Sequence, residues 1–238
     1  MRVKDKALVL KSIKHGENKR ILKIFTRNHG LITVCAYPTK SGKGRIRRAT
    51  LQPMSLIEIQ ISLKRNEEIH QMNEASLYFI PDENLHSLLK NSMIHFLNEV
   101  LLKVIREHYN NPDLFDFVET SVKYIDHESS DFENFHIYFL IELSRYLGVS
   151  PQNNFSAELS YFNLLEGKFS STALLYPQGL DAQESILFSE ELRKNTIVRN
   201  NSNANRKKIL SILLTYYRLH IHGFNELKSL EVIRELLI

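Results

Sequence analysis

The chain has 238 residues, of which 43% are hydrophobic and 24% charged, and a formal net charge of +4. These proportions are typical of a globular protein and exclude collagen-like, disordered and disulfide-framework chains. Its one cysteine, Cys35, excludes an internal disulfide and a zinc site built from several cysteines. No apolar run reaches the roughly 18 residues of a membrane span, and no signal-peptide core follows the basic N-terminus. We therefore expect a cytoplasmic protein.

The net charge averages two unlike parts of the chain. Residues 1–80 hold 16 Lys+Arg and 6 Asp+Glu, a net of +10, whereas residues 81–238 hold 15 and 21, a net of −6. Residues 1–50 alone hold 14 basic and 2 acidic residues. Such a concentration indicates a polyanionic partner, most commonly nucleic acid, although a solvated basic surface without a partner is the alternative.

Residues 1–80 have the pattern of five short strands. The clearest strand runs from Ile57 to Lys64, where apolar and polar residues alternate with a period of two. Shorter β-rich runs lie at residues 7–13, 20–25, 31–37 and 68–77, with glycine-containing turns at residues 15–18, 28–30 and 39–44. This pattern predicts a small barrel, either an OB-fold or an SH3-like barrel. Pro81 marks the predicted domain boundary.

Helical spacing begins after residue 81. Apolar residues at steps of three and four predict helices over residues 85–105, 112–125 and 131–147, the last capped by Asp131 and stopped by Gly148. Residues 149–180 are irregular, with one small hairpin at residues 160–170 that turns at Glu166-Gly167. Helices return from about residues 183, 204 and 225. The prediction is an α+β chain with a barrel domain at 1–80 and an all-α helical domain at 81–238.

Candidate nucleic-acid contacts lie in two basic sets of the N-terminal part. The loop KSGKGRIRR, residues 40–48, carries Lys40, Lys43, Arg45, Arg47 and Arg48. A predicted strand carries the second set, which consists of Lys19, Arg20, Lys23 and Arg27. Lys23 alternates with apolar neighbours, so we expect its side chain to point away from the barrel interior.

Aromatic residues and a late basic cluster are weaker candidates. Phe25 and Tyr37 lie at strand ends, where a base could stack on the ring. Packing in the core is the favoured interpretation for Phe25, and the two interpretations are equal for Tyr37. The cluster Arg206, Lys207 and Lys208 opens a predicted helix. It is either a second nucleic-acid contact or a solvated first turn.

The sequence contains no recognisable catalytic or metal-binding motif. There is no phosphate-binding loop, no GxSxG turn and no HExxH motif. His220 and His222 are two apart, so they would not share one face of a helix. We therefore predict no catalytic residues, no metal and no cofactor.

Two blocks at opposite ends of the chain resemble the RecO family of bacterial recombination mediators. The first is LVLKSIKHGENKRILKIFTRNHGLITV at residues 8–34, followed by LQPMS at residues 51–55. The second comprises YYRLH at residues 216–220, Gly223-Phe224 and LKS at residues 227–229. Both blocks and the total length agree with that family.

The resemblance implies an N-terminal OB-fold followed by a helical domain. It also implies binding of single- and double-stranded DNA, annealing of complementary strands and, with RecR, loading of RecA onto DNA coated by single-strand-binding protein. The acidic tail of that protein would contact the helical domain, and the barrel would meet RecR. No catalytic turnover and no membrane association are implied.

The chain departs from the family pattern in one respect. Many members carry a four-cysteine zinc module in the region that matches residues 149–180, and this chain has no cysteine there. We expect a hairpin insertion without zinc, held by the packing of Phe155, Tyr161, Phe162 and Phe169.

Two functions of other classes stay open at this point. A non-enzymatic adaptor would use the basic barrel to dock an acidic protein, and it would show no DNA affinity on its own. A hydrolase or transferase acting on nucleic acid would show turnover and a metal requirement.

Overall fold

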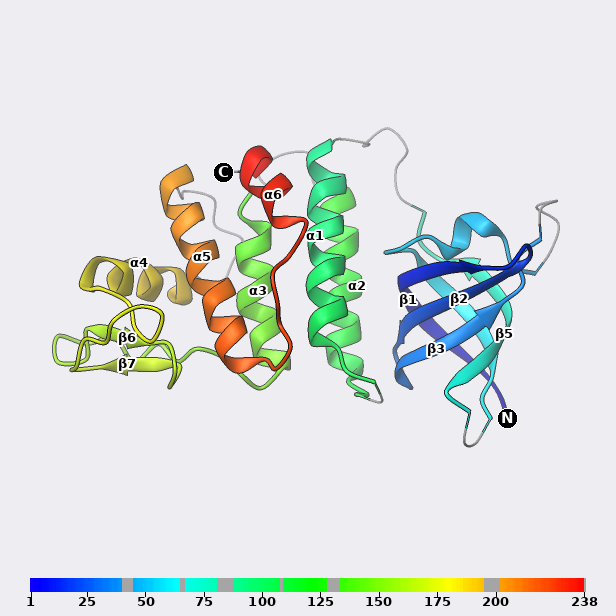
Figure 1. Cartoon of the computed structure of the whole chain (residues 1–238), viewed down its shortest axis with the longest axis horizontal. Helices are drawn as coiled ribbons and strands as arrows, with labels where there is room; N and C mark the ends of the chain where they lie inside the picture. Colours follow the sequence, from blue (N-terminus) through cyan, green and yellow to red (C-terminus); the bar gives the residue numbers. More distant parts are fainter. Residues whose placement is uncertain are drawn as a thin grey trace. The chain divides into compact units, whose positions relative to one another are not determined.

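The computed structural model describes residues 1–39, 45–64, 67–80, 88–107, 109–127, 133–194 and 202–237. The order of its elements confirms the α+β prediction (Figure 1). The first part contains β1 (Arg2–His15), β2 (Lys19–Thr26), β3 (Gly30–Ala36), a 3-10 turn (Arg48–Leu51), β4 (Leu56–Ser62) and β5 (Ile69–Leu77). The second contains α1 (Leu88–Val104), α2 (Pro112–His127), α3 (Phe135–Tyr146), β6 (Tyr161–Asn163), β7 (Lys168–Ser170), α4 (Ala182–Arg193), α5 (Asn203–His220) and α6 (Leu230–Leu237).

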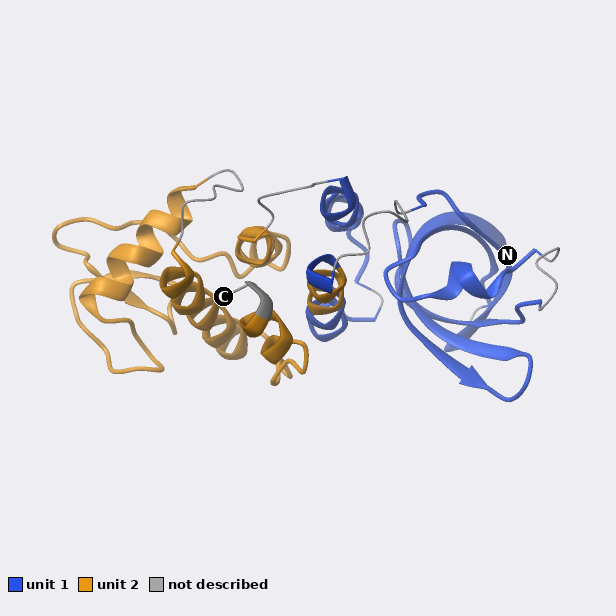
Figure 2. Cartoon of the chain, turned by 90° about the horizontal axis from the view of Figure 1, so that it is seen from above, with its two compact units in different colours: residues 1–90, 98–127 blue, residues 91–97, 128–238 orange. Residues whose placement is uncertain are grey.

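The N-terminal strands form a closed barrel in the order β1-β2-β3-β5-β4, visible as a ring in Figure 2. All neighbours are antiparallel except β3 and β5, which pair in parallel from Thr33–Ile69 to Cys35–Gln71. This mixed order confirms the OB-fold and excludes the alternative barrel type. β1 takes part in two pairings along its 14 residues, and the register shifts between Val9 and Lys11.

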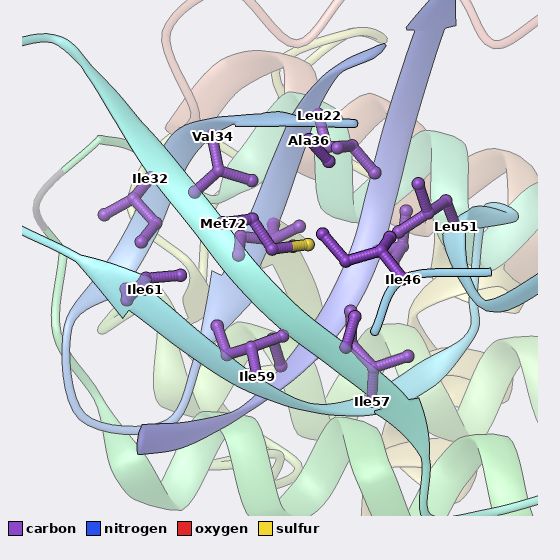
Figure 3. Close-up of a cluster of buried hydrophobic side chains, with 14 residues drawn as sticks. Leu22, Ile32, Val34, Ala36, Ile46, Leu51, Ile57, Ile59, Ile61 and Met72 are labelled. Atoms are coloured by element: carbon purple, nitrogen blue, oxygen red, sulfur yellow. The ribbon is translucent and has the colours of Figure 1, made fainter. Parts of the chain in front are cut away.

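The barrel encloses a core of aliphatic side chains (Figure 3). The alternation predicted for residues 57–64 is confirmed, because Ile57, Ile59 and Ile61 are buried while Glu58 is exposed. Each such isoleucine contributes about 1.5–3 kcal/mol through removal of its side chain from water. Met72 from β5 and Ile46 from the segment after β3 complete the packing.

Helix α2 is packed against the barrel within one compact unit of the chain. Phe25 of β2 meets Phe115 of α2 with ring centroids 5.6 Å apart, and both rings are buried. The core interpretation of Phe25 is therefore confirmed. Near them, Gly30 has a φ of +68°, and a Cβ there would lie 2.5 Å from the Tyr109 carbonyl oxygen. Only glycine satisfies both the backbone conformation and this close approach.

Asp5 organises the turn between β2 and β3. Its carboxylate accepts hydrogen bonds from the backbone N–H groups of Lys6 and Asn28, from the Asn28 side chain and from His29 Nδ1, at 2.8–3.1 Å. The Asn28 carbonyl in turn accepts a 2.9 Å bond from Asn110 Nδ2. The turn is thus fixed both to β1 and to the segment that precedes α2.

The hairpin region is held by aromatic packing. Phe162 of β6 lies 4.9 Å from Phe169, 4.8 Å from Phe188 of α4 and 6.2 Å from Tyr216 of α5, all as centroid distances. Phe155 meets Phe169 at 5.3 Å. The expected packing of Phe155, Phe162 and Phe169 is confirmed, whereas Tyr161 is only half-buried.

Helix boundaries differ from the prediction in two places. The last helix begins at Leu230 rather than at Asn225, because buried Phe224 and Leu227 belong to a bend that ends with the Leu230 amide bonded to the Leu227 carbonyl. Helix α3 begins at Phe135, while the predicted cap Asp131 lies outside the described residues, as do Leu85 and Phe132. Gly148 ends the α3 region as predicted, with a φ of +72°.

The chain divides into two compact units, coloured in Figure 2. One comprises residues 1–90 and 98–127, and the other comprises residues 91–97 and 128–238. The proposed domain boundary at residue 80 stays a prediction. In the described part of the chain, no helix is long and apolar enough to cross a bilayer.

Candidate nucleic-acid interface

The outer face of strands β1, β2 and β3 collects cations and apolar side chains. Leu22 and Ile24 point into the barrel, so Lys19, Ile21 and Lys23 alternate to the outside. The register places Lys11 opposite Lys23 and Ile13 opposite Ile21, which extends this surface across β1. We name the outer strand face by its residues Lys11, Ile13, Lys19, Ile21, Lys23, Thr33, Tyr37 and Ile69.

Exposed apolar side chains lie among these cations. Ile13, Tyr37 and Ile69 are 49%, 53% and 45% exposed. Ile69 is on the same face because it pairs directly with Thr33. Cations that attract phosphates, combined with apolar and aromatic groups that contact bases, are the elements of a single-strand nucleic-acid platform.

The segment after β3 brings arginines to one side of β5. The Ala75 amide bonds to the Arg45 carbonyl at 3.0 Å, and the Thr39 amide bonds to the Ile46 carbonyl at 3.1 Å. Arg45 is highly exposed and forms a 3.1 Å ion pair with Glu74. In the described part of the chain, Arg47 and Arg48 have no carboxylate partner. The predicted contacts Lys40 and Lys43, with Gly42 and Gly44, lie outside the described residues.

A groove of about 330 Å³ opens beside Tyr37. We name it the Tyr37 groove, lined by Arg2, Tyr37, Thr39, Arg45, Ile46, Gln60, Gln71, Met72 and Asn73. The neighbouring Cys35 side chain raises the pKa of Tyr37 above the ordinary value for a phenol. Cys35 itself is a buried thiol.

Sequence reasoning missed Arg2 as a member of this groove. The basic segment MRVKDK, which contains Arg2, was used only to exclude a signal peptide. Arg2 begins β1 and is exposed. The signal available in the sequence was its charge just ahead of a β-rich run.

Two predicted contacts are paired with acidic residues of the segment that contains α2. Arg27 donates two hydrogen bonds of 2.8 Å to the Asp116 carboxylate. These bonds raise the pKa of Arg27 and lower the pKa of Asp116. Lys23 forms a single 3.1 Å ion pair with Glu107, and its outward orientation is confirmed. Arg20 donates a 2.8 Å bond to the Ser12 hydroxyl.

The late basic cluster divides in the structure. Arg206 is only 7% exposed and pairs with Glu133 at 3.0 Å. Its guanidinium also bonds to the Asn203 side chain. Lys207 and Lys208 are exposed in the second turn of α5, and Lys208 lies 3.4 Å from Glu184. Only these two lysines present charge at the surface.

Among the described residues, no group of three or more His, Cys, Asp or Glu side chains could hold a metal ion. A cavity of about 790 Å³ is lined by charges of both signs, including Lys6, Arg27, Glu58 and Asp116. Most of these charges compensate one another, because Lys6 pairs with Glu119 and Arg27 pairs with Asp116. This cavity lacks the single-sign charge that marks a polyanion site.

Comparison with known proteins now decides the family. The description "Recombination protein O N terminal" matches residues 1–80, and "Recombination protein O C terminal" matches residues 85–231. The chain belongs to the RecO family. Three relatives named DNA repair protein RecO are those of Christiangramia forsetii, at 33% identity, and of Phocaeicola vulgatus and Flavobacterium johnsoniae, each at 30%. The alignments cover 98–99% of this chain and of each relative.

Membership in the RecO family makes the chain a DNA repair protein and agrees with the prediction of a non-enzymatic mediator. The site residues themselves are not decided by this comparison.

Proposed function

We propose that the chain is a recombination mediator that binds single- and double-stranded DNA on its barrel and anneals complementary strands. The observation that carries the proposal is the gathering of cations and exposed apolar groups on the outer strand face and in the Tyr37 groove. Family membership supplies the context of DNA repair.

On the barrel, the cations that carry binding are those whose charge is accessible. They are Arg2, Lys11, Lys19, Lys23, Arg45, Arg47 and Arg48, with Lys40 and Lys43 kept from the sequence prediction. Lys23 and Arg45 qualify because exposed ion pairs are worth about 0–1 kcal/mol, so a phosphate can replace the carboxylate. Arg27 and Arg206 are left out, because a bidentate bond holds the first and burial covers the second.

Annealing follows from the same surface. Two DNA strands repel each other through their phosphates, and a shared row of lysines and arginines reduces that repulsion. Exposed Ile13 and Ile69 and the ring of Tyr37 hold bases unpaired and available for pairing. In this proposal RecR meets the barrel, the helical domain binds the acidic tail of single-strand-binding protein, and the assembly helps load RecA.

The salt dependence of binding tests the electrostatic mechanism. Six phosphate contacts to single-stranded DNA predict a slope of about −4 in a plot of log K against log salt concentration. Fluorescence anisotropy with a labelled oligonucleotide measures this slope. A binding constant independent of salt would falsify the mechanism.

A triple variant localises the contacts. Substitution of Arg45, Arg47 and Arg48 by Gln removes about three contacts and should reduce the slope by about 2 units for every sequence alike. The matched control is Arg145→Gln with Lys168→Gln and Arg218→Gln, which removes the same charge from exposed sites of the other unit. Equal losses in both variants would show that only net charge matters.

The mediator role requires its own experiment. Annealing of complementary oligonucleotides, and RecA filament assembly on DNA coated by single-strand-binding protein, should be followed with and without RecR. We expect annealing by the chain alone and loading only with RecR. An adaptor without DNA affinity would give no mobility shift and no annealing.

A further inference from the structure

The Tyr37 groove has features that a purely electrostatic surface does not need. We infer that it holds one unpaired base and favours bases that carry an exocyclic amino group over thymine, with Gln71 as the residue that makes the distinction. This inference rests on the proposed DNA binding and adds a base preference to it.

Tyr37 provides the platform for one base. Its ring follows β3 directly, is 53% exposed and lines the groove. A tyrosine side chain has only two torsion angles, so it loses little conformational freedom when a base stacks on its ring. A base inside a duplex is covered by neighbours on both faces, so only an unpaired base can stack there.

The rim of the groove carries charge for the flanking phosphates. Arg2 is held in place because the N-terminal ammonium donates a 2.9 Å bond to the Leu63 carbonyl. Arg45 is fixed through the bond between its carbonyl and the Ala75 amide. The groove volume of about 330 Å³ lies at the small end of ligand sites, which span about 300–1,000 Å³. One nucleotide is the occupant that suits this size and charge.

Gln71 presents an acceptor to the groove. Its Nε2 donates a 2.9 Å bond to the Met72 carbonyl, which fixes the orientation of the amide because a carbonyl can only accept. The Oε1 atom is therefore the free polar group of this side chain. Asn73 also uses its amide nitrogen within the protein, since its Nδ2 donates a 2.8 Å bond to the Ser62 hydroxyl.

An acceptor at this point discriminates between bases. Adenine, cytosine and guanine each carry an exocyclic amino group that can donate to Gln71 Oε1. Thymine carries none, and its single N–H donor lies between two carbonyl oxygens that an acceptor repels. Cytosine and thymine differ little in size, so this pair isolates the hydrogen bond from the stacking.

The test compares oligo(dC) and oligo(dT) of equal length in competition anisotropy with the full-length protein. One additional hydrogen bond predicts that oligo(dC) binds about three- to tenfold more tightly than oligo(dT). In the Gln71→Leu variant the ratio should fall to about one, because the acceptor that selects the amino group is lost. Tyr37→Ala should weaken both oligonucleotides, and Tyr37→Phe should keep the preference.

The outcomes separate the two proposals. Absence of binding to either oligonucleotide overturns the proposed function and this inference together. Tight but equal binding of oligo(dC) and oligo(dT) overturns the base preference alone. A preference that persists in Gln71→Leu also overturns it, because another group would then be responsible. Thermal unfolding of each variant establishes that a lost preference does not reflect a lost fold.

Discussion

The Arg27–Asp116 pair differs from the other ion pairs of the barrel in its geometry. Both of its hydrogen bonds are 2.8 Å long and bidentate, whereas Lys23–Glu107 and Arg45–Glu74 each rest on one contact of 3.1 Å. Bidentate pairs are the stronger class. This pair joins the β2–β3 turn to α2, so its role is to hold the unit together rather than to bind phosphate.

A pH series on Asp116→Asn tests that role. The hydrogen bonds from Arg27 lower the pKa of Asp116, so the pair stabilises the fold above the ordinary carboxyl pKa of about 4. This stabilisation is lost as the pH falls through the lowered pKa. Urea denaturation should therefore show a difference between wild type and variant that is large at pH 7 and shrinks as the pH falls below about 4. The control Glu107→Gln should change stability by less than about 1 kcal/mol. A difference that stays constant with pH would contradict the assignment.

The partners of individual cations could not be predicted from the sequence. Asp116 follows Arg27 by 89 positions and Glu107 follows Lys23 by 84. Arg206 stands in a run of three cations near the start of α5, and nothing in the neighbouring sequence indicates that Glu133 pairs with it. Charge runs show where cations are, but only the fold shows which of them are neutralised.

At the level of elements, the strands were predictable and the closure of the barrel was not. The alternation in residues 57–64 predicts β4 because one of its faces is dry and the other is wet. The parallel pairing of β3 with β5 joins two strands that are far apart in the sequence. The hydrophobic periodicity of each strand does not indicate which strand it pairs with. The barrel was predicted from the count of five strands and from the resemblance to the RecO family. The sequence predicts an earlier start for α6 than the structure shows. Leu227 lies at helical spacing from the apolar residues of α6, but it is buried as part of the preceding bend.

The aromatic cluster around Phe162 gives a second stability prediction. Phe162 is fully buried, and its ring meets three other rings from β7, α4 and α5. Phe162→Ala should cost about 3–5 kcal/mol through lost transfer energy and the cavity that remains. Chemical denaturation followed by circular dichroism measures this cost, and Leu175→Ala is the control because Leu175 is exposed. A loss below 1 kcal/mol would show that the hairpin does not depend on this cluster.

At the scale of the whole molecule, a buried histidine lowers the stability of the fold in acid. His136 of α3 is fully buried, and desolvation, followed by the charge of Arg206, lowers its pKa to about 3. The unfolded chain binds this proton near pH 6.5, so the unfolded state gains protons first as the pH falls. Stability should therefore decrease from about pH 6.5 downward, by up to about 1.4 kcal/mol per pH unit.

The variant that tests this effect is His136→Gln. Its free energy of unfolding should depend less on pH between 6 and 4 than that of the wild type. The matched control is His15→Gln, at the exposed end of β1. Parallel pH profiles of wild type and His136→Gln would show that other groups lower the stability in acid.

The aromatic packing of the hairpin region has a consequence for the cell that contains this protein. A four-cysteine module ties the folding of a repair protein to zinc supply and to reduced thiols. Here the corresponding segment has no cysteine, and rings from Phe155, Phe162, Phe169 and Phe188 supply the cohesion. We therefore expect this segment to stay folded when zinc is scarce or when thiols are oxidised.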